Sequence, residues 1–164
     1  MTQYEVVQRL ASVATTYDVH EGGGAAIAFV ARGAPTSMTP KFTLVDDKDR
    51  ELATLEGNFN KTKFHIRTAD NKELARVSFP SVAFKKTLAL TVGDRTFNAD
   101  AGVLALEYDF KCVGADGQVG VEVKKPEGLT RVRDRFFVTA GEDMPREVAV
   151  LLAVAIHSRY FEMI

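Results

Sequence analysis

This sequence has almost no cysteine. The sequence also lacks a strong net charge and an N-terminus that resembles a leader. Cys112 is the one cysteine among 164 residues, which excludes an intramolecular disulfide and a zinc site built from cysteines. The formal net charge of −1 provides no basic field to gather nucleic acid, so nucleic-acid binding is not expected. Residues 1–5 lack the basic and apolar regions of a secretion signal, which predicts a cytoplasmic, reducing location.

The length and composition are those of an ordinary globular protein. Hydrophobic residues make up 46% of the chain and charged residues 26%, values typical of a folded domain. A chain of this length can bury a substantial core in one unit. The sequence therefore predicts a single domain over residues 1–164.

Most of the chain has the pattern of short β-strands. Residues 42–45, 64–67 and 119–123 alternate apolar with mostly polar positions, which is the period of a strand with one buried face. Clusters of glycine, aspartate and asparagine separate such runs, as expected for turns. Between Tyr4 and Val138 we count roughly 11 to 12 strand candidates, and this regular spacing favours a sandwich or a barrel.

A repeated unit lies in the first half of the chain. Residues 41–55 contain Lys-Phe-Thr-Leu, a polar turn and Glu-Leu-Ala-Thr-Leu, and residues 63–77 repeat the pattern with Lys-Phe-His-Ile and Glu-Leu-Ala-Arg-Val. Each copy predicts a β-hairpin. Residues 17–24 and 110–117 look like looser copies. Because the copies are few and irregularly spaced, we interpret them as hairpins of one closed sheet rather than as a solenoid.

An uninterrupted apolar run follows the last expected strand. Every residue from Val148 to Ile156 is apolar, and with Asp143 as N-cap and Pro145 in the first turn we predict a helix over about residues 144–160. These nine residues would rise about 14 Å, whereas a bilayer core of about 30 Å needs roughly 20. A helix that is apolar on all sides must then be enclosed by protein. The sequence predicts a closed antiparallel β-barrel around this helix and no transmembrane span.

This plan resembles the tubby-like C-terminal superfamily, which includes tubby proteins, phospholipid scramblases and the plant LURP-one-related proteins. Three features carry the resemblance: the hairpins at 41–55 and 63–77, the Phe-Phe-Val strand at 136–138, and the ending from Val148 to Glu162. That ending, an apolar helix closed by an aromatic pair and a glutamate, is similar to the scramblase C-terminus. The resemblance covers the chain from about Tyr17 onward.

The resemblance implies a non-enzymatic binding module without a cofactor, because tubby domains bind phosphoinositides through surface lysine and arginine. It implies an anionic phospholipid or a protein as partner, and a position in the cytoplasm or peripheral to a membrane. Two alternatives stay open. A scramblase-type lipid-acting protein would require calcium, but arginines are interleaved at residues 133–138, where scramblases carry an acidic segment. A protein-interaction scaffold would bind its partner without lipid.

The remaining candidate constellations predict neither catalysis nor a metal site. His20, His65 and His157 lie in separate segments, and a Gly-x-Ser-x-Gly elbow is missing, so no nucleophilic triad is predicted. We interpret His65 and His157 as structural or surface residues. The acidic group at residues 46–51 is interrupted by basic residues and predicts a solvated turn, and the three glycines at 22–24 predict another turn.

Basic residues supply the one candidate binding site. The candidate ligand-binding residues are Lys85, Lys86, Lys124, Lys125, Arg131, Arg133 and Arg135. The three arginines occupy alternate positions, so they would share one strand face. If the basic residues converge at a barrel mouth, they would bind a phosphorylated head group. The alternative is that they are solvated charges that protect sheet edges.

Overall fold

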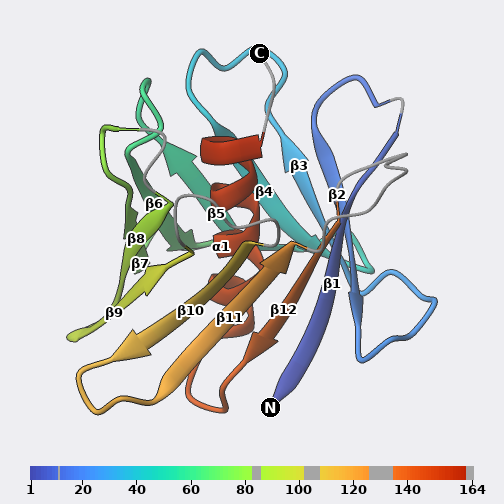
Figure 1. Ribbon diagram of the computed structural model, residues 1–164. Coiled ribbons are helices and arrows are strands. Elements are labelled where there is room, and N and C mark those ends of the chain that lie inside the picture. The colour runs from blue at the N-terminus through green and yellow to red at the C-terminus, as the bar shows by residue number, and fades with distance from the viewer. Residues whose placement is uncertain (11, 83–85, 102–107, 126–134, 162–164) are drawn as a thin grey trace.

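The barrel wall is built from antiparallel strands that follow one another along the chain. The computed structural model describes residues 1–10, 12–82, 86–101, 108–125 and 135–161, and Figure 1 shows them as a wall of strands around a central helix. The strands in these ranges are β1 (Thr2–Gln8), β2 (Thr16–Glu21), β3 (Phe29–Gly33), β4 (Lys41–Asp46), β5 (Glu51–Gly57), β6 (Lys63–Thr68), β7 (Glu73–Ser78), β8 (Thr87–Val92), β9 (Arg95–Asp100), β10 (Tyr108–Gly114), β11 (Val119–Lys125) and β12 (Arg135–Ala140). Each strand pairs with the next, and β1 pairs with β12. The prediction of a closed antiparallel barrel is confirmed.

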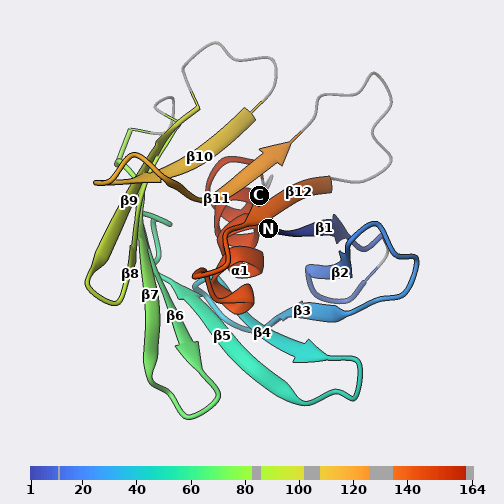
Figure 2. The same ribbon diagram turned by 90° about the horizontal axis from the view of Figure 1, so that it is seen from below.

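The alternation of side chains decides which face of each strand is buried. In β6 the side chains of Phe64 and Ile66 are fully buried, whereas Lys63 is exposed and His65 half-exposed. Phe64 lies opposite the buried Val77 of β7, so the two strands present apolar residues to the same interior. Inward side chains from all the strands pack with the helix in one core. Figure 2 shows the helix inside the ring of strands.

The repeated sequence unit folds into hairpins whose turns share one backbone geometry. In the β4–β5, β6–β7 and β10–β11 hairpins, one residue donates its backbone N–H to the carbonyl four residues later. The pairs are Asp46–Arg50, Thr68–Lys72 and Gly114–Gln118, at 3.0, 2.8 and 3.0 Å. The fourth residue of each turn has a positive φ: 65° at Asp49, 66° at Asn71 and 80° at Gly117. A register shift precedes each turn, so the looser copy at 110–117 has the same turn and bulge.

The apolar run forms α1 (Arg146–Ile156), which continues into a π-helical turn, η1 (His157–Phe161). All residues from Val148 to Ile156 are buried. The prediction that this helix is enclosed by the barrel is therefore confirmed. Among the described residues, no helix combines the length and apolar composition that a membrane crossing requires.

The predicted N-cap of this helix is wrong. Pro145, not Asp143, occupies the N-cap position, and no side chain caps the helix. Asp143 lies in a turn that the Met144 N–H closes on the Gly141 carbonyl at 3.1 Å. Because Pro145 has an extended ψ of 135°, helical geometry begins only after it, at Arg146.

Two strand glycines leave room for phenylalanine rings inside the barrel. A Cβ atom at Gly57 would lie 2.6 Å from the ring of Phe64, which is its cross-strand partner. A Cβ atom at Gly120 would lie 2.5 Å from the ring of Phe97. Both rings are fully buried, so each glycine is required by the packing of an aromatic side chain against its backbone.

Candidate functional site

The barrel has two ends with different loops. Because the strands are antiparallel and follow chain order, successive loops alternate between the ends. The chain start and the beginning of α1 lie at one end, and the last helical turn lies at the other (Figure 1). We call them the Met1 end and the η1 end. The described loop residues of the η1 end belong to 9–15, 34–40, 58–62 and 79–86, together with Ala101.

The two ends differ in charge. Acidic residues outnumber basic ones in the loops of the Met1 end: Asp47, Asp49, Asp70, Asp94, Asp116, Glu142 and Asp143 against Lys48, Arg50 and Lys72. Among the described loop residues of the η1 end, the charged ones are Arg9, Lys61 and Lys86, with no acidic residue among them. Among the described loop residues, those of the Met1 end are therefore net acidic and the charged ones of the η1 end are basic.

The structure places the described members of the predicted basic site at the η1 end. Lys86 precedes β8, Lys124 and Lys125 end β11, and Arg135 begins β12. The other predicted members, Lys85, Arg131 and Arg133, lie outside the described residues.

Two of these basic residues belong to the outer wall. The Nζ atom of Lys124 lies 3.9 Å from Oδ2 of Asp109 on β10. The Nε atom of Arg135 lies 3.2 Å from Oε1 of Glu5 on β1. Both basic side chains are about half-exposed, and exposed ion pairs of this kind contribute little to stability. These two cations balance strand carboxylates on the wall.

The other two basic residues turn toward aromatic rings of η1. The Nζ atom of Lys86 lies 4.9 Å from the ring centroid of Tyr160, and that of Lys125 lies 4.9 Å from the ring centroid of Phe161. Such distances are within the range of cation–π attraction. Lys125 is only 3% exposed. Cations and aromatic rings therefore form a cluster inside the rim of the η1 end.

Arg159 holds neighbouring loops of this end together. Its guanidinium donates hydrogen bonds to the carbonyl of Pro80 at 2.7 Å and to that of Ser81 at 3.2 Å. It also donates to the carbonyl of Asn60 at 3.2 Å. One side chain of η1 thus ties the β5–β6 turn to the β7–β8 loop, and this fixes both loops relative to the helix.

Tyr160 and His157 are polar groups held by the core. Burial raises the pKa of the Tyr160 phenol, and its hydroxyl donates to the Thr87 carbonyl at 3.0 Å. His157 is buried, and its Nδ1 lies 2.5 Å from the hydroxyl of Tyr17 on β2. His157 also packs edge-on against Phe136. These contacts give both residues a structural role at the η1 end.

The other residues tested for chemistry occupy separate places. Cys112 is buried, and this raises the pKa of its thiol to about 12, so it is poorly suited to act as a nucleophile at neutral pH. His65 faces outward, with Nδ1 2.9 Å from a carboxylate oxygen of Glu73. Residues 46–51 form the β4–β5 turn, where the Asp46 carboxylate accepts backbone N–H groups at 2.9 Å. In the described part of the chain, histidine, cysteine and carboxylate side chains form no group of three able to hold a metal ion.

Sequence reasoning missed the residues of η1 as members of this site. The predicted helix over about residues 144–160 includes Arg159 and Tyr160, and Phe161 belongs to the aromatic pair that carries the resemblance. None of the three is predicted as part of a binding site, yet they supply the rings and the guanidinium that organise the η1 end. The available signal was the change from apolar to polar residues after Ile156. That change marks the point at which the helix reaches the barrel mouth.

The comparison with known protein families agrees with this architecture. The model of the LURP-one-related family matches residues 2–157. The matched region begins well before Tyr17, the residue from which the sequence resemblance was drawn. Among curated proteins, the search found no match.

Proposed function

The chain belongs to the LURP-one-related family of the tubby-like C-terminal superfamily, and we propose that it is a non-enzymatic module whose η1 end binds anionic phospholipid head groups. The family match confirms the LURP-one-related part of the resemblance. It gives no support to the scramblase type, which remains a prediction.

The observation that carries this proposal is the charge difference between the described loops of the two ends. Arg9, Lys61 and Lys86 are the charged residues of the described η1-end loops, with Arg9 paired to Asp18 of β2, and the described loops of the opposite end are net acidic. In the field of an anionic membrane, the barrel would turn its η1 end toward the lipid. Each basic residue close to such a surface contributes about 1 kcal/mol to attraction.

Co-sedimentation with vesicles tests the proposal. We expect the protein to pellet with phosphatidylcholine vesicles that contain phosphatidylserine or a phosphoinositide, and to remain in solution with pure phosphatidylcholine. Because the attraction is electrostatic, added salt should weaken the binding. Equal binding to neutral vesicles would contradict recognition of the head group, and a failure to pellet with any vesicle would point to a protein partner instead.

Charge reversals at the two ends provide matched variants. Lys61→Glu/Lys86→Glu changes the η1 end, and Lys48→Glu/Lys72→Glu makes the same change at the Met1 end. The first pair should reduce affinity for anionic vesicles by at least about tenfold. The second pair should change affinity far less, because its side chains face away from the bound surface. Equal effects of both pairs would mean that net charge alone governs binding.

Lys125 is a poor choice for such a test. Its side chain is buried over the ring of Phe161. Lys125→Glu would place a carboxylate against an aromatic face, and burial of that charge would destabilise the fold. Lys124→Glu changes the neighbouring outer position and leaves the interior intact.

A further inference from the structure

The most exposed apolar side chains of the described loops lie at the η1 end. Val13, Met38 and Phe59 are 99%, 85% and 76% exposed. They occupy three different loops, the β1–β2, β3–β4 and β5–β6 connections. Large apolar side chains exposed together on a folded protein mark a surface that another molecule covers.

The three tips surround one depression. Val13, Met38 and Phe59 all line an open hollow of about 360 Å³, together with Lys41 and Lys61. The tips are therefore neighbours in space although they are far apart in sequence. The hollow therefore has apolar side chains at its rim and the positive charges of two lysines beside them.

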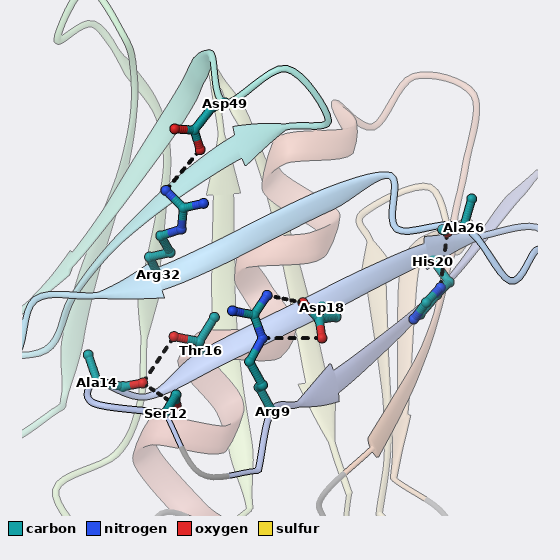
Figure 3. A network of polar contacts seen from close by, with 9 residues as sticks. All are labelled: Arg9, Ser12, Ala14, Thr16, Asp18, His20, Ala26, Arg32 and Asp49. Carbon is teal, nitrogen blue, oxygen red and sulfur yellow. Dashed lines mark hydrogen bonds and ion pairs between the residues drawn. The ribbon is translucent and has the colours of Figure 1, made fainter.

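The loop that carries Val13 is held in shape by its own polar groups. The Ala14 carbonyl accepts hydrogen bonds from the hydroxyls of Ser12 at 2.5 Å and Thr16 at 3.0 Å. At the base of the loop, the guanidinium of Arg9 binds the carboxylate of Asp18 at 2.6 Å, as Figure 3 shows. The polar groups bond within the loop, and the Val13 side chain is left exposed.

The turn that carries Phe59 is fixed in a similar way. The side-chain oxygen of Asn58 accepts the backbone N–H groups of Thr62 at 2.8 Å and Lys63 at 3.0 Å. Arg159 binds the carbonyl of Asn60 from the helix side. Phe59 is thus presented on a constrained turn, so inserting its ring into an apolar medium requires little further ordering of the chain.

We propose that Val13, Met38 and Phe59 insert into the boundary between the head groups and acyl chains of an anionic bilayer. This inference rests on the proposed binding of anionic phospholipid and adds the depth and orientation of the bound protein. Arg9 is paired with Asp18, but Lys41 and Lys61 line the hollow between the tips, and their charge complements an anionic lipid surface. The barrel would stand with its η1 end in the lipid interface and its acidic Met1 end in water.

Single tryptophan reporters test the insertion, because the sequence contains no tryptophan of its own. Phe59→Trp places a reporter at the proposed depth, and Ile27→Trp places one in the β2–β3 loop of the Met1 end, where Ile27 is 42% exposed. The vesicles are phosphatidylcholine with phosphatidylserine, prepared with and without brominated acyl chains. We expect the emission of the Phe59→Trp variant to shift to the blue and to be quenched by bromine, whereas the emission of the Ile27→Trp variant stays unchanged.

A triple variant tests the energetic contribution of the tips. Val13→Ser/Met38→Ser/Phe59→Ser removes apolar groups that are already exposed, so the melting temperature should change little. Its affinity for the anionic vesicles should fall by at least about tenfold. Ile27→Ser at the opposite end is the control and should bind as the unaltered protein does.

The outcomes separate the two proposals. If the protein pellets with anionic vesicles but the Phe59→Trp emission is neither shifted nor quenched, insertion is wrong and head-group binding stands. If it pellets equally with neutral vesicles and the Phe59→Trp emission is quenched, insertion stands and head-group recognition is wrong. Failure to pellet at all overturns both. A blue shift of the Phe59→Trp emission that grows with protein concentration in the absence of lipid would show that a second copy covers the tips, which also overturns insertion.

Discussion

Asp109 is a carboxylate in an unfavourable place on the barrel wall. It lies on β10 beside Glu122 of β11, in a register where Asp109 opposes Lys124. Burial raises the pKa of the Asp109 carboxyl, and so do the hydrogen bond to Glu122 and the repulsion from its charge. The nearby lysines act in the opposite direction. Folding therefore makes ionisation of Asp109 less favourable than it is in the unfolded chain.

The variant Asp109→Asn should stabilise the protein at neutral pH. Because the folded-state pKa lies above the unfolded one, the favourable contribution of the protonated carboxyl is complete below about pH 3.9 and is lost as pH rises through the folded value. An amide at this position carries no charge and can still donate to Glu122. We expect the free energy of unfolding to rise by roughly 0.5–1 kcal/mol at pH 7 and to stay unchanged near pH 3.

Thermal unfolding followed by circular dichroism at both pH values measures this difference. Asp94→Asn in the β8–β9 turn is the control and should show no gain at neutral pH. A lower melting temperature for Asp109→Asn at pH 7 would show that the Asp109 charge is stabilising, contrary to the prediction.

Lys124 and Lys125 show which part of the candidate site the sequence predicts and which part it does not. Lys124 and Lys125 were predicted as a pair, yet Lys124 faces outward and Lys125 is buried. The alternation of β11 contained this information, because Lys125 continues the series of inward residues Val121 and Val123. The partner ring of Phe161 was not predictable, because it comes from a segment that meets β11 only in the folded barrel.

At the scale of elements, β11 depends on a glycine that accommodates a ring from β9. Gly120→Ala would place a Cβ atom 2.5 Å from the buried Phe97 ring. The Phe97 ring is fully buried, so a shift away from the new Cβ atom would press it against other core residues. We expect the free energy of unfolding to fall by about 1–3 kcal/mol, as for other overpacked cores. Chemical denaturation measures the loss.

A second substitution shows whether the clash is the cause. Phe97→Leu alone removes part of the ring and destabilises the core. In the double variant with Gly120→Ala, the smaller side chain should relieve the clash, so the combined loss should be less than the sum of the two single losses. Strict additivity would mean that the alanine acts through the strand backbone and not through Phe97.

The elements themselves were largely predictable, and the reason is their regular pattern. The repeated unit in residues 41–55 and 63–77 predicts two hairpins, and the structure adds that their turns share one geometry. The apolar run at 148–156 identified the helix. The N-cap at Asp143 failed because capping depends on the backbone of Pro145, which residue preference alone does not determine.

At the scale of the whole molecule, wall and helix form one core. The buried residues of the strands and those of α1 belong to a single cluster. Deleting residues 142–164 would remove the helix from this cluster and leave the apolar interior of the barrel without its central element. We expect this shortened chain to lose cooperative thermal unfolding and to aggregate, because the apolar interior would be open to water.

Circular dichroism and size-exclusion chromatography of the shortened chain, beside the full chain, measure this. A monomer with a β-sheet spectrum and a sharp melting transition would show that the strands close without α1. The single-domain prediction for residues 1–164 would then need revision.

The order of the elements has a consequence for biosynthesis. All the strands named above precede α1 in the chain, so the ribosome completes the wall before the segment that fills it. One edge of β1 can pair with β2 early, but its other edge stays unpaired until β12 has been synthesised. At translation rates of about 5–20 residues per second, the nascent chain would expose apolar strands for several seconds. Folding of this protein in the cell should therefore depend on chaperones that hold the nascent chain until the helix emerges.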